Sequence, residues 1–321
     1  MRVTVVRPGD LGAAEATLWR SFQDSTPQGL NPFMSFTFTQ TVDRFRPSAR
    51  VAVVEDEGHI VAFLPFERRA YGAAMPIGHP MNNLQAFMSD GFPMDMRWAV
   101  KQARLAGWRF TCVPADQRVL VPFHHEGTTV SCPVIDLAKG DLSLIGARKK
   151  ARRALEKQFG PVSLEWNNAQ PAHIERMIDW KSHKYHGTAR LFSDQTARSI
   201  VECLATSTDS DCSGVVSVLF AGEQPIAVHI GLLGPRSLAG WFMSYDPALR
   251  AFAPGMMLWN PLAAAAAERE VTQIDLGAGQ DIYKFGLSND SYMVAGGAVW
   301  ARRSEAAARK LFRRFRARLS S

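Results

Sequence analysis

Apolar and polar positions follow two different periods along the chain, and together they predict a protein that mixes strands and helices. The segment VAVVEDEGHIVAFLPF, at 51–66, has two β-branched and apolar runs around a polar turn, which is typical of a β-hairpin. The segment VSVLFAGEQPIAVHIG, at 216–231, has the same order of runs and turn. The residues that match at a constant offset of 165 are Val53 with Val218 and Val61-Ala62 with Ile226-Ala227. The pattern therefore predicts an internal repeat.

The surroundings of the two hairpins extend the repeat. A helical stretch precedes each of them, over 35–45 in the first half and 194–205 in the second. We expect two copies of one α/β (α+β) unit, each a mixed, mostly antiparallel twisted sheet flanked by helices. A basic helix that begins at Asp141 or Ser143 and ends at Gly160-Pro161 would join them.

The second half carries the clearer succession of elements. The expected elements are a helix over 171–185, a loop over 186–192, a helix over 194–205, a hairpin over 216–232, a strand over 237–245, a turn over 246–254, a helix over 255–270, a strand over 271–276, a turn over 277–284 and a strand over 294–301. The expected domains are 1–140, the linker helix 141–160, 161–301 and a C-terminal basic helix over 302–321.

Composition places this pattern in a globular protein. The chain has 321 residues, of which 46% are hydrophobic, and it lacks a run of eighteen apolar residues. Its first residues lack the apolar segment of a signal peptide, and its four cysteines are scattered without metal-site spacing. We expect free thiols and a cytoplasmic protein.

The net charge of +7 belongs to one end of the chain. Eight bases and one acid lie in 302–321, so the rest of the chain is neutral. A neutral body argues against DNA and tRNA as partners. Within 304–321, Leu311, Phe312, Phe315 and Leu319 recur at helical spacing among arginines. This basic amphipathic helix either packs on its own domain or contacts anionic lipid peripherally at the inner face of the membrane.

A strand, a turn and a helix between Trp241 and Lys284 provide the first candidate site. The turn Arg250-Ala251-Phe252-Ala253-Pro254-Gly255 opens onto an apolar helix. The first N–H groups of a helix and its dipole favour a phosphate or pyrophosphate. The linker helix, with bases such as Arg152 and Arg153, either faces solvent or lies beside this cleft and attracts an anionic ligand.

Residues over about 145–300 carry a resemblance to a known family. They are Trp180, Lys181, Tyr185, Ile226 to His229, Trp241, Tyr245-Asp246-Pro247, Pro254-Gly255, Ile274 to Gly277, Gly279 and Tyr283-Lys284, with the basic linker. In them the chain resembles the CelD/BcsL-type acetyltransferases, a GNAT branch associated with exopolysaccharide genes and related to the tandem-GNAT FemAB peptidyltransferases. The first half resembles a degenerate partner domain by pattern only.

The resemblance implies a function and a co-substrate. It implies tandem GNAT-like domains and an N- or O-acyltransferase, of the acetyltransferase kind, that uses acetyl-CoA or another acyl-CoA and no metal. The acceptor would be a sugar, an amino sugar or a lipid-linked intermediate of exopolysaccharide or envelope synthesis. GNAT enzymes bind the coenzyme A pyrophosphate with a Q/R-x-x-G-x-G/A turn. Arg250 to Gly255, with Met256 after them, match this turn, except that Ala253 replaces its first glycine.

Acyl transfer from a thioester needs a base for the acceptor and an acid for the leaving thiolate. His229, in the apolar strand IAVHIGLL, is a candidate base, or else a hydrogen-bonded core histidine. Asp275 ends a strand, where it could act as a base, orient the acceptor or cap the turn. Tyr245 could protonate the thiolate, or simply pack.

Five further residues are candidates for the acceptor side. Trp180, Lys181 and Tyr185 could form its wall, although aromatic residues at helical spacing are more often core. Tyr283 and Lys284 follow the GAGQ turn, and Lys284 could hold an anionic group or lie on the surface. His124-His125 and the pair His183 and His186 lack the spacing of metal ligands.

Two other functions remain open at this point. The FemAB relatives have the same fold and use aminoacyl-tRNA, so the chain could transfer an aminoacyl group. It could also be a GNAT-fold binding module without catalysis, which the alanine at 253 would favour.

Overall fold

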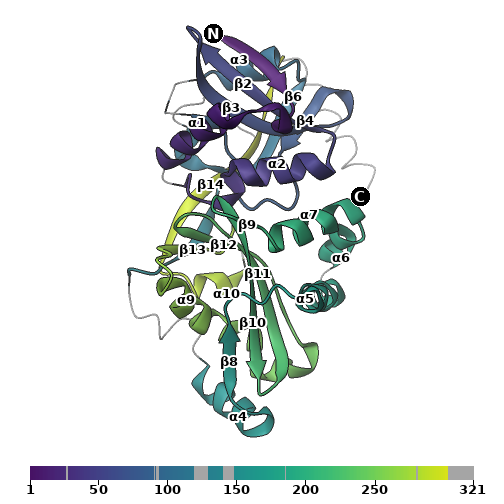
Figure 1. Cartoon of the computed structure of the whole chain (residues 1–321), viewed down its shortest axis with the longest axis vertical. Coiled ribbons are helices and arrows are strands. Elements are labelled where there is room, and N and C mark those ends of the chain that lie inside the picture. Colours follow the sequence, from purple (N-terminus) through teal and green to yellow (C-terminus); the bar gives the residue numbers. More distant parts are fainter. Residues whose placement is uncertain are drawn as a thin grey trace, which may run out of the picture.

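The fold of the chain is one long sheet that runs through two halves. The computed structural model describes residues 1–26, 28–89, 91, 94–118, 129–139, 148–184, 186–279 and 281–302. Figure 1 shows the first half above and the second half below, with helices against the sheet in each. This mixed, mostly antiparallel sheet with flanking helices confirms the predicted fold class.

The two halves contribute their elements in chain order. The elements of the first half are β1 Arg2–Val6, α1 Ala13–Asp24, α2 Phe36–Phe45, β2 Ala49–Asp56, β3 His59–Arg68, β4 Ala73–Pro76, β5 Met88–Ser89, α3 Met96–Gln102, β6 Gly107–Pro114 and β7 Thr129–Asp136. Those of the second half are α4 Lys149–Phe159, β8 Val162–Glu165, α5 Pro171–Lys184, α6 His186–Phe192, α7 Gln195–Ala205, β9 Thr208–Asp209, β10 Cys212–Ala221, β11 Gln224–Leu233, β12 Ser237–Tyr245, α8 Pro254–Met257, α9 Trp259–Ala267, β13 Gln273–Asp275, α10 Ile282–Phe285 and β14 Asp290–Trp300. Short 3₁₀ helices lie at Pro8–Asp10, Pro32–Met34, Ala70–Gly72, Ala115–Arg118 and Pro247–Phe252.

The strands follow one path through both halves. Their order is β1-β2-β3-β4-β6-β14-β7-β13-β12-β11-β10-β8, with β5 beside β3 and β9 beside β10. Neighbours along the path are antiparallel except for two parallel pairs, β4 with β6 and β12 with β13. In the parallel pair β12–β13, pairing ends at Ala239 and Asp275 although β12 continues.

The hairpins β2–β3 and β10–β11 reproduce each other in register. Val53 pairs with Phe63, and Val218 pairs with Val228, so the offset of 165 residues holds on both strands of the pair. Each hairpin has an irregularity at the equivalent place, after Val54 in the first and after Leu219 in the second. The internal repeat predicted from the sequence is confirmed, and the structure adds a bulge that both hairpins share.

Strand β14 crosses between the halves. It follows the last helix of the second half, yet it lies between β6 and β7 of the first half. Strand β7 in turn pairs with β13 of the second half. The predicted boundary near residue 140 therefore divides the chain between strands, such as β7 and β13, that are hydrogen-bonded neighbours in the sheet.

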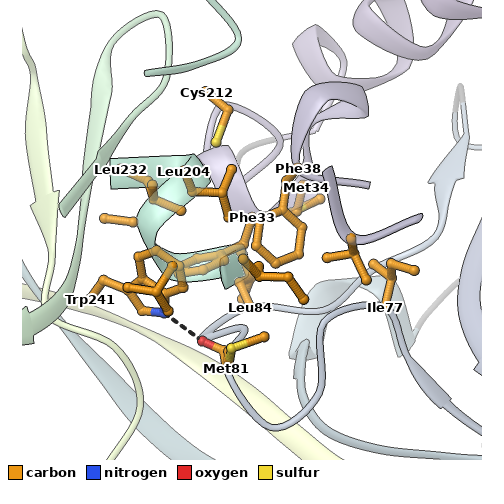
Figure 2. Close-up of a cluster of buried hydrophobic side chains, with 14 of the residues drawn as sticks. Phe33, Met34, Phe38, Ile77, Met81, Leu84, Leu204, Cys212, Leu232 and Trp241 are labelled. Atoms are coloured by element: carbon orange, nitrogen blue, oxygen red, sulfur yellow. Dashed lines mark hydrogen bonds between the residues drawn. The ribbon is translucent and has the colours of Figure 1, made fainter. Parts of the chain in front are cut away.

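A continuous apolar core fills the junction. Phe33, Met81 and Leu84 of the first half pack with Leu232 and Trp241 of the second half (Figure 2). The indole Nε1 of Trp241 donates to the carbonyl of Met81 at 2.8 Å. A second core lies under α9, and a third lies in the first half.

Two predicted elements differ from the structure. Residues 186–192 form helix α6 rather than a loop. The helix is held by packing, since the ring centroids of Phe192 and Phe242 lie 5.1 Å apart. The helix expected over 255–270 is two helices, α8 and α9, which meet at Leu258. Pro261 has no N–H for the carbonyl of Met257, so the helical ladder lacks that bond.

Other boundaries shift by a few residues. Strand β13 covers only 273–275 of the predicted 271–276, and β14 begins at Asp290 rather than at 294. Helix α10 occupies part of the turn predicted over 277–284. The linker helix ends at Phe159 before Gly160, as predicted, and begins at Lys149; its predicted caps Asp141 and Ser143 lie outside the described residues.

Candidate functional site

An opening between two parallel strands is the centre of the candidate site. Strand β13 pairs with β12 only through residues 273–275, and the last pair is Ala239 with Asp275. Strand β12 continues to Tyr245 with β11 on its other side. Beyond Ala239 the edge of β12 therefore has no pairing with β13, and the carbonyl of Gly240 accepts from Asn83 Nδ2 of the first half at 2.8 Å. Ligands of α/β sheets commonly bind where the carboxyl ends of parallel strands diverge.

Helix α8 begins at the far end of this edge. After β12, the 3₁₀ helix Pro247–Phe252 leads through Ala253 into Pro254 and Gly255. Asp246 caps the 3₁₀ helix by accepting from the N–H of Ala248 at 2.9 Å. A Cβ on Gly255 would lie 2.9 Å from Cδ1 of Tyr245, so glycine lets the helix approach β12 closely.

Ala253 adopts the left-handed conformation that the turn requires. Its φ is 53° and its ψ is 52°. A non-glycine residue there is strained by roughly 1–2 kcal/mol, because Cβ approaches the following carbonyl oxygen. The predicted motif has a glycine at this position, and the structure supplies the physical reason for that preference.

Helix α4 packs beside this turn. The ring of Phe159, at the end of α4, meets that of Phe252 edge to face with centroids 6.3 Å apart. The side chains of Lys149, Lys150, Arg153 and Lys157 on α4 are exposed. The basic linker helix thus contacts the segment that was predicted to hold a pyrophosphate, while its exposed bases fit both of its interpretations.

His229 lies on the side of the sheet that α9 covers. Its neighbours Val228 and Ile230 belong to the junction core, so the alternation of the strand points His229 to the opposite face. It is fully buried, and its ring contacts that of Trp259 with centroids 5.4 Å apart. Burial, with a smaller contribution from the charge of Lys181, lowers the pKa of His229 to about 3. The imidazole is therefore neutral at pH 7.

The carboxylate of Asp275 lies on the opposite face and joins four donors. Oδ2 accepts from Asn31 Nδ2 at 2.8 Å and from the Tyr292 hydroxyl at 2.6 Å. Oδ1 accepts from the N–H of Gly277 at 2.7 Å and from Cys132 Sγ at 3.2 Å. Asp275 caps its own turn, as one interpretation predicted, and it also links that turn to segments of the first half.

The charge of Asp275 influences its donors. Burial and the nearby carboxylate both raise the pKa of the Tyr292 hydroxyl well above its usual value, and they also raise the pKa of the Cys132 thiol. Both groups are neutral at pH 7 and remain donors. The side chains of Asp275 and His229, although both were candidate bases, lie on different faces and do not form a dyad.

Tyr245 lies at the end of β12 beside α8, five residues beyond Gly240. It packs partly buried against the core under α9. Five residues of strand span about 16 Å. Tyr245 therefore lies close to the start of α8 and far from the point at which β12 and β13 separate.

Lys181 reaches β12 from α5, on the face opposite α9. Its Nζ donates to the carbonyl of Met243 at 3.1 Å, on the separated stretch of the strand. Trp180, on the same helix, packs partly buried against the junction core with the guanidinium of Arg176 5.9 Å from its ring centre. Tyr185 lies outside the described residues.

Lys284 folds back onto the turn that follows β13. Its Nζ donates to the carbonyl of Gly277 at 3.2 Å and lies 3.8 Å from the carboxylate of Asp281. Its neighbours Ile282, Tyr283 and Phe285 are exposed apolar side chains on α10. The end of β13 therefore carries an apolar surface beside a lysine that supports the turn.

The described ranges hold no group of three or more His, Cys, Asp or Glu side chains arranged as metal ligands would be. His124-His125 lie outside these ranges. All four cysteines are free thiols, as predicted. No helix in the described part of the chain is long and apolar enough to cross a bilayer.

Comparisons with known proteins agree with this geometry. Residues 146–285, which contain α4, α5, the opening and α8, match the family model described as an acetyltransferase (GNAT) domain. This is the CelD/BcsL-type family that the sequence resembles. No curated protein sequence matches the chain significantly.

Solved structures share the fold over nearly the whole chain. FemX matches with a TM-score of 0.56 at 10% identity, over 93% of this chain and 96% of its own. The C-terminal domain of a protein named as a lysylphosphatidylglycerol synthetase, from Agrobacterium fabrum, matches with 0.55 at 11% identity, over 85% and 90%. A tandem GNAT protein from the clavulanic acid biosynthesis pathway matches with 0.51 at 11% identity, over 94% and 98%. The chain has the tandem GNAT fold.

Sequence reasoning missed several residues of the site. Asn31, Cys132 and Tyr292 surround Asp275, and each comes from a segment distant from it in the chain. Trp259 meets His229 from α9. A polar residue in an apolar strand was the signal that identified His229, but nothing in the sequence indicates which residue packs against it.

Proposed function

We propose that the chain is an acyl-CoA-dependent N- or O-acyltransferase, and that its donor lies between β12 and β13. The observation that carries this proposal is the separation of the two strands at Gly240, with α8 at the far end of the open edge. The segment that contains both features matches a GNAT acetyltransferase model.

The donor would lie along β12. Its pyrophosphate would bind at Arg250 to Met256, where exposed bases on α4 add positive potential. Its thioester would lie about 16 Å away near Gly240. The extended arm that joins the pyrophosphate and the sulfur in coenzyme A has a similar length. In this pose Tyr245 contacts the pyrophosphate end of the donor. It could protonate the thiolate only if the sulfur lay closer to Tyr245 than this pose places it. The turnover of Tyr245→Phe tests that role.

The acceptor would approach from the α5 face, where Trp180 and Lys181 lie. In the reaction, an acceptor N–H or O–H loses its proton while its nitrogen or oxygen bonds to the thioester carbon. The C–S bond then breaks, and the thiolate takes up a proton. Asp275 is on this face and His229 is not; because its buried carboxylate already accepts from four donors, it would orient the acceptor only in place of one of them.

The acceptor class is proposed from the family resemblance. A sugar, amino sugar or lipid-linked intermediate of exopolysaccharide or envelope synthesis remains our proposal. The exposed apolar residues of α10, next to the end of β13, favour an acceptor with an apolar portion. A peripheral contact of 304–321 with anionic membrane would bring the chain to such an acceptor; these residues lie outside the described part.

Calorimetry with coenzyme A, acetyl-CoA and a long-chain acyl-CoA tests the donor. We expect a Kd of about 1–10 µM for at least one of them, equivalent to about −8 to −7 kcal/mol. Thiol release with a panel of amino sugars and polyprenyl-linked sugars then tests the transfer. The absence of binding by all three compounds would contradict the proposal.

Aminoacyl transfer from tRNA is the second candidate, because FemX shares the fold over nearly the whole chain. It predicts no coenzyme A binding and a strong, salt-sensitive affinity for aminoacyl-tRNA. Binding of neither donor would instead favour a GNAT-fold module without catalysis.

A further inference from the structure

Two buried polar side chains, His229 and Trp259, lie in contact on the α9 face of the sheet. Both ring nitrogens of His229 and the indole nitrogen of Trp259 lack a hydrogen-bond partner among the described residues. Buried polar atoms are nearly always hydrogen-bonded, because an unpaired atom has lost its bond to water without replacement. Three such atoms meet in this one ring contact, which makes it a candidate place for a polar group to bind.

This contact borders the opening between β12 and β13. A Cβ on Gly240 would lie 3.2 Å from the carbonyl oxygen of Asp275, 3.4 Å from Cη2 of Trp259 and 3.7 Å from Nε2 of His229. Gly240 follows Ala239, where the pairing of the two strands ends. A group that enters between the strands at this point would meet both rings.

The internal repeat shows that this position accepts an apolar side chain. The residues equivalent to His229 and Gly231, at the same register of the first hairpin, are Leu64 and Phe66. Both are fully buried in an apolar core. The second hairpin instead has an imidazole and a glycine, and a Cβ on Gly231 would lie 2.7 Å from Cε1 of His229. The polar ring and the space for it therefore occur together, in the half that matches the acetyltransferase domain.

We infer that His229 and Trp259 bind the acyl group of the donor and select one that carries a neutral hydroxyl. This inference rests on the proposed function, since it places the thioester near Gly240. A hydroxyl both donates and accepts, so it can pair two of the three atoms, donating to the unprotonated imidazole nitrogen and accepting from the indole N–H. A hydrocarbon chain would leave these atoms unpaired, and sites built for a hydroxyl discriminate strongly against analogues without one.

The charge state of the pair excludes charged acyl groups. Because burial lowers the pKa of His229 to about 3, the imidazole is neutral at pH 7 and offers one lone pair. A carboxylate or ammonium on the acyl chain would lose its hydration beside two neutral rings. A neutral hydroxyacyl thioester meets both requirements.

The test compares two donors that differ by one hydroxyl, 3-hydroxybutyryl-CoA and butyryl-CoA. We expect the wild-type chain to bind the hydroxyacyl ester about tenfold or more tightly, as measured by calorimetry. Trp259→Phe removes the N–H together with part of the indole ring and should reduce the ratio to within about threefold. Trp108→Phe is the matched control, because Trp108 is also fully buried with an unpaired Nε1 but lies in the core of the first half. It should keep the wild-type ratio.

A second variant covers the case in which Trp259→Phe does not fold. His229→Leu introduces the residue found at the equivalent position of the first hairpin, and it should likewise abolish the preference. Equal or tighter binding of butyryl-CoA by the wild type would overturn the inference, as would a preference that survives in both variants. Failure to bind either ester while acetyl-CoA or a long-chain acyl-CoA binds would also overturn the inference, whereas failure to bind any coenzyme A compound would instead overturn the proposed function.

Discussion

At the scale of single residues, two residues of the candidate site, Ala253 and His229, lower the stability of the fold. Ala253 has a left-handed conformation at the entrance to α8. The imidazole of His229 is buried without a hydrogen-bond partner among the described residues. Such local costs persist when the surrounding structure determines them, and they concentrate at functional sites. Each of these two costs can be measured by a substitution that removes it.

Replacement of Ala253 by glycine should stabilise the chain. Glycine adopts a φ of 53° without strain, so Ala253→Gly should raise the free energy of unfolding by about 1 kcal/mol, measured by urea denaturation. Ala251→Gly, two residues earlier in the 3₁₀ helix, is the control and should lower it. A loss of stability in both variants would contradict the strain assigned to Ala253.

Replacement of His229 by leucine should reduce the sensitivity of the fold to acid. The pKa of His229 is about 3 in the folded chain and about 6.5 when unfolded, so the unfolded state binds the proton first. The wild type should therefore lose about 2 kcal/mol of stability between pH 7 and pH 5 that His229→Leu does not lose. Urea denaturation of both proteins at the two pH values measures the difference. Equal losses would show that His229 is solvated or paired in solution.

At the scale of elements, the sequence pattern was most reliable where it was periodic and locally capped. Helix α2 begins after Ser35, which accepts from the N–H of Phe38, and α7 begins after Asp194, which accepts from that of Thr196. The pattern failed for α6, since a seven-residue helix has little periodicity and depends on packing with α5 and α7. The prediction of one helix over 255–270 was wrong because Pro261 has no N–H to continue the helical hydrogen bonds.

Reversal of the charge at Arg250 tests the junction between β12 and α8. Arg250→Glu should weaken coenzyme A binding about tenfold or more, because a carboxylate would face the pyrophosphate. Arg236→Glu is a matched control, since Arg236 is also exposed but lies before the other end of β12. Calorimetry of both variants at two salt concentrations gives the comparison. Equal affinities would remove the pyrophosphate from this turn.

At the scale of the whole molecule, the second half depends on the first for its own strands. Strand β14 lies between β6 and β7, and β7 lies against β13. The carboxylate of Asp275 accepts from Asn31, Cys132 and Tyr292 at the same place. The two halves form one sheet with a shared polar cluster, although the sequence repeat describes them as two similar units.

Loss of the carboxylate charge at Asp275 should weaken this junction. Asp275→Asn places an NH₂ group against one pair of donors and should cost about 2–3 kcal/mol of unfolding free energy. Tyr292→Phe removes one donor and should cost about 1–2 kcal/mol. Thermal unfolding followed by circular dichroism compares them. If Asp275→Asn retains full stability but loses turnover, Asp275 acts on the acceptor and not on the junction.

The second half should not fold alone. A fragment of residues 146–301 would expose the edges of β13 and β14 and the apolar face of Trp241, so we expect no cooperative unfolding transition. Addition of the separately expressed fragment 1–140 should restore the near-ultraviolet circular dichroism. A fragment 146–301 that unfolds cooperatively by itself would show that the halves are independent.

The sequence by itself determined the local part of this protein. It predicted the two hairpins and their shared offset, the helices before them, and the turn from Arg250 to Gly255, because periodicity, caps and turn residues act over short distances. Only the tertiary structure decided that β14 enters the first half, that Asp275 and His229 lie on opposite faces, and that Trp259 meets His229. These contacts join residues far apart in the chain, where the burial of apolar faces and the pairing of strand edges, rather than local preference, select the partner.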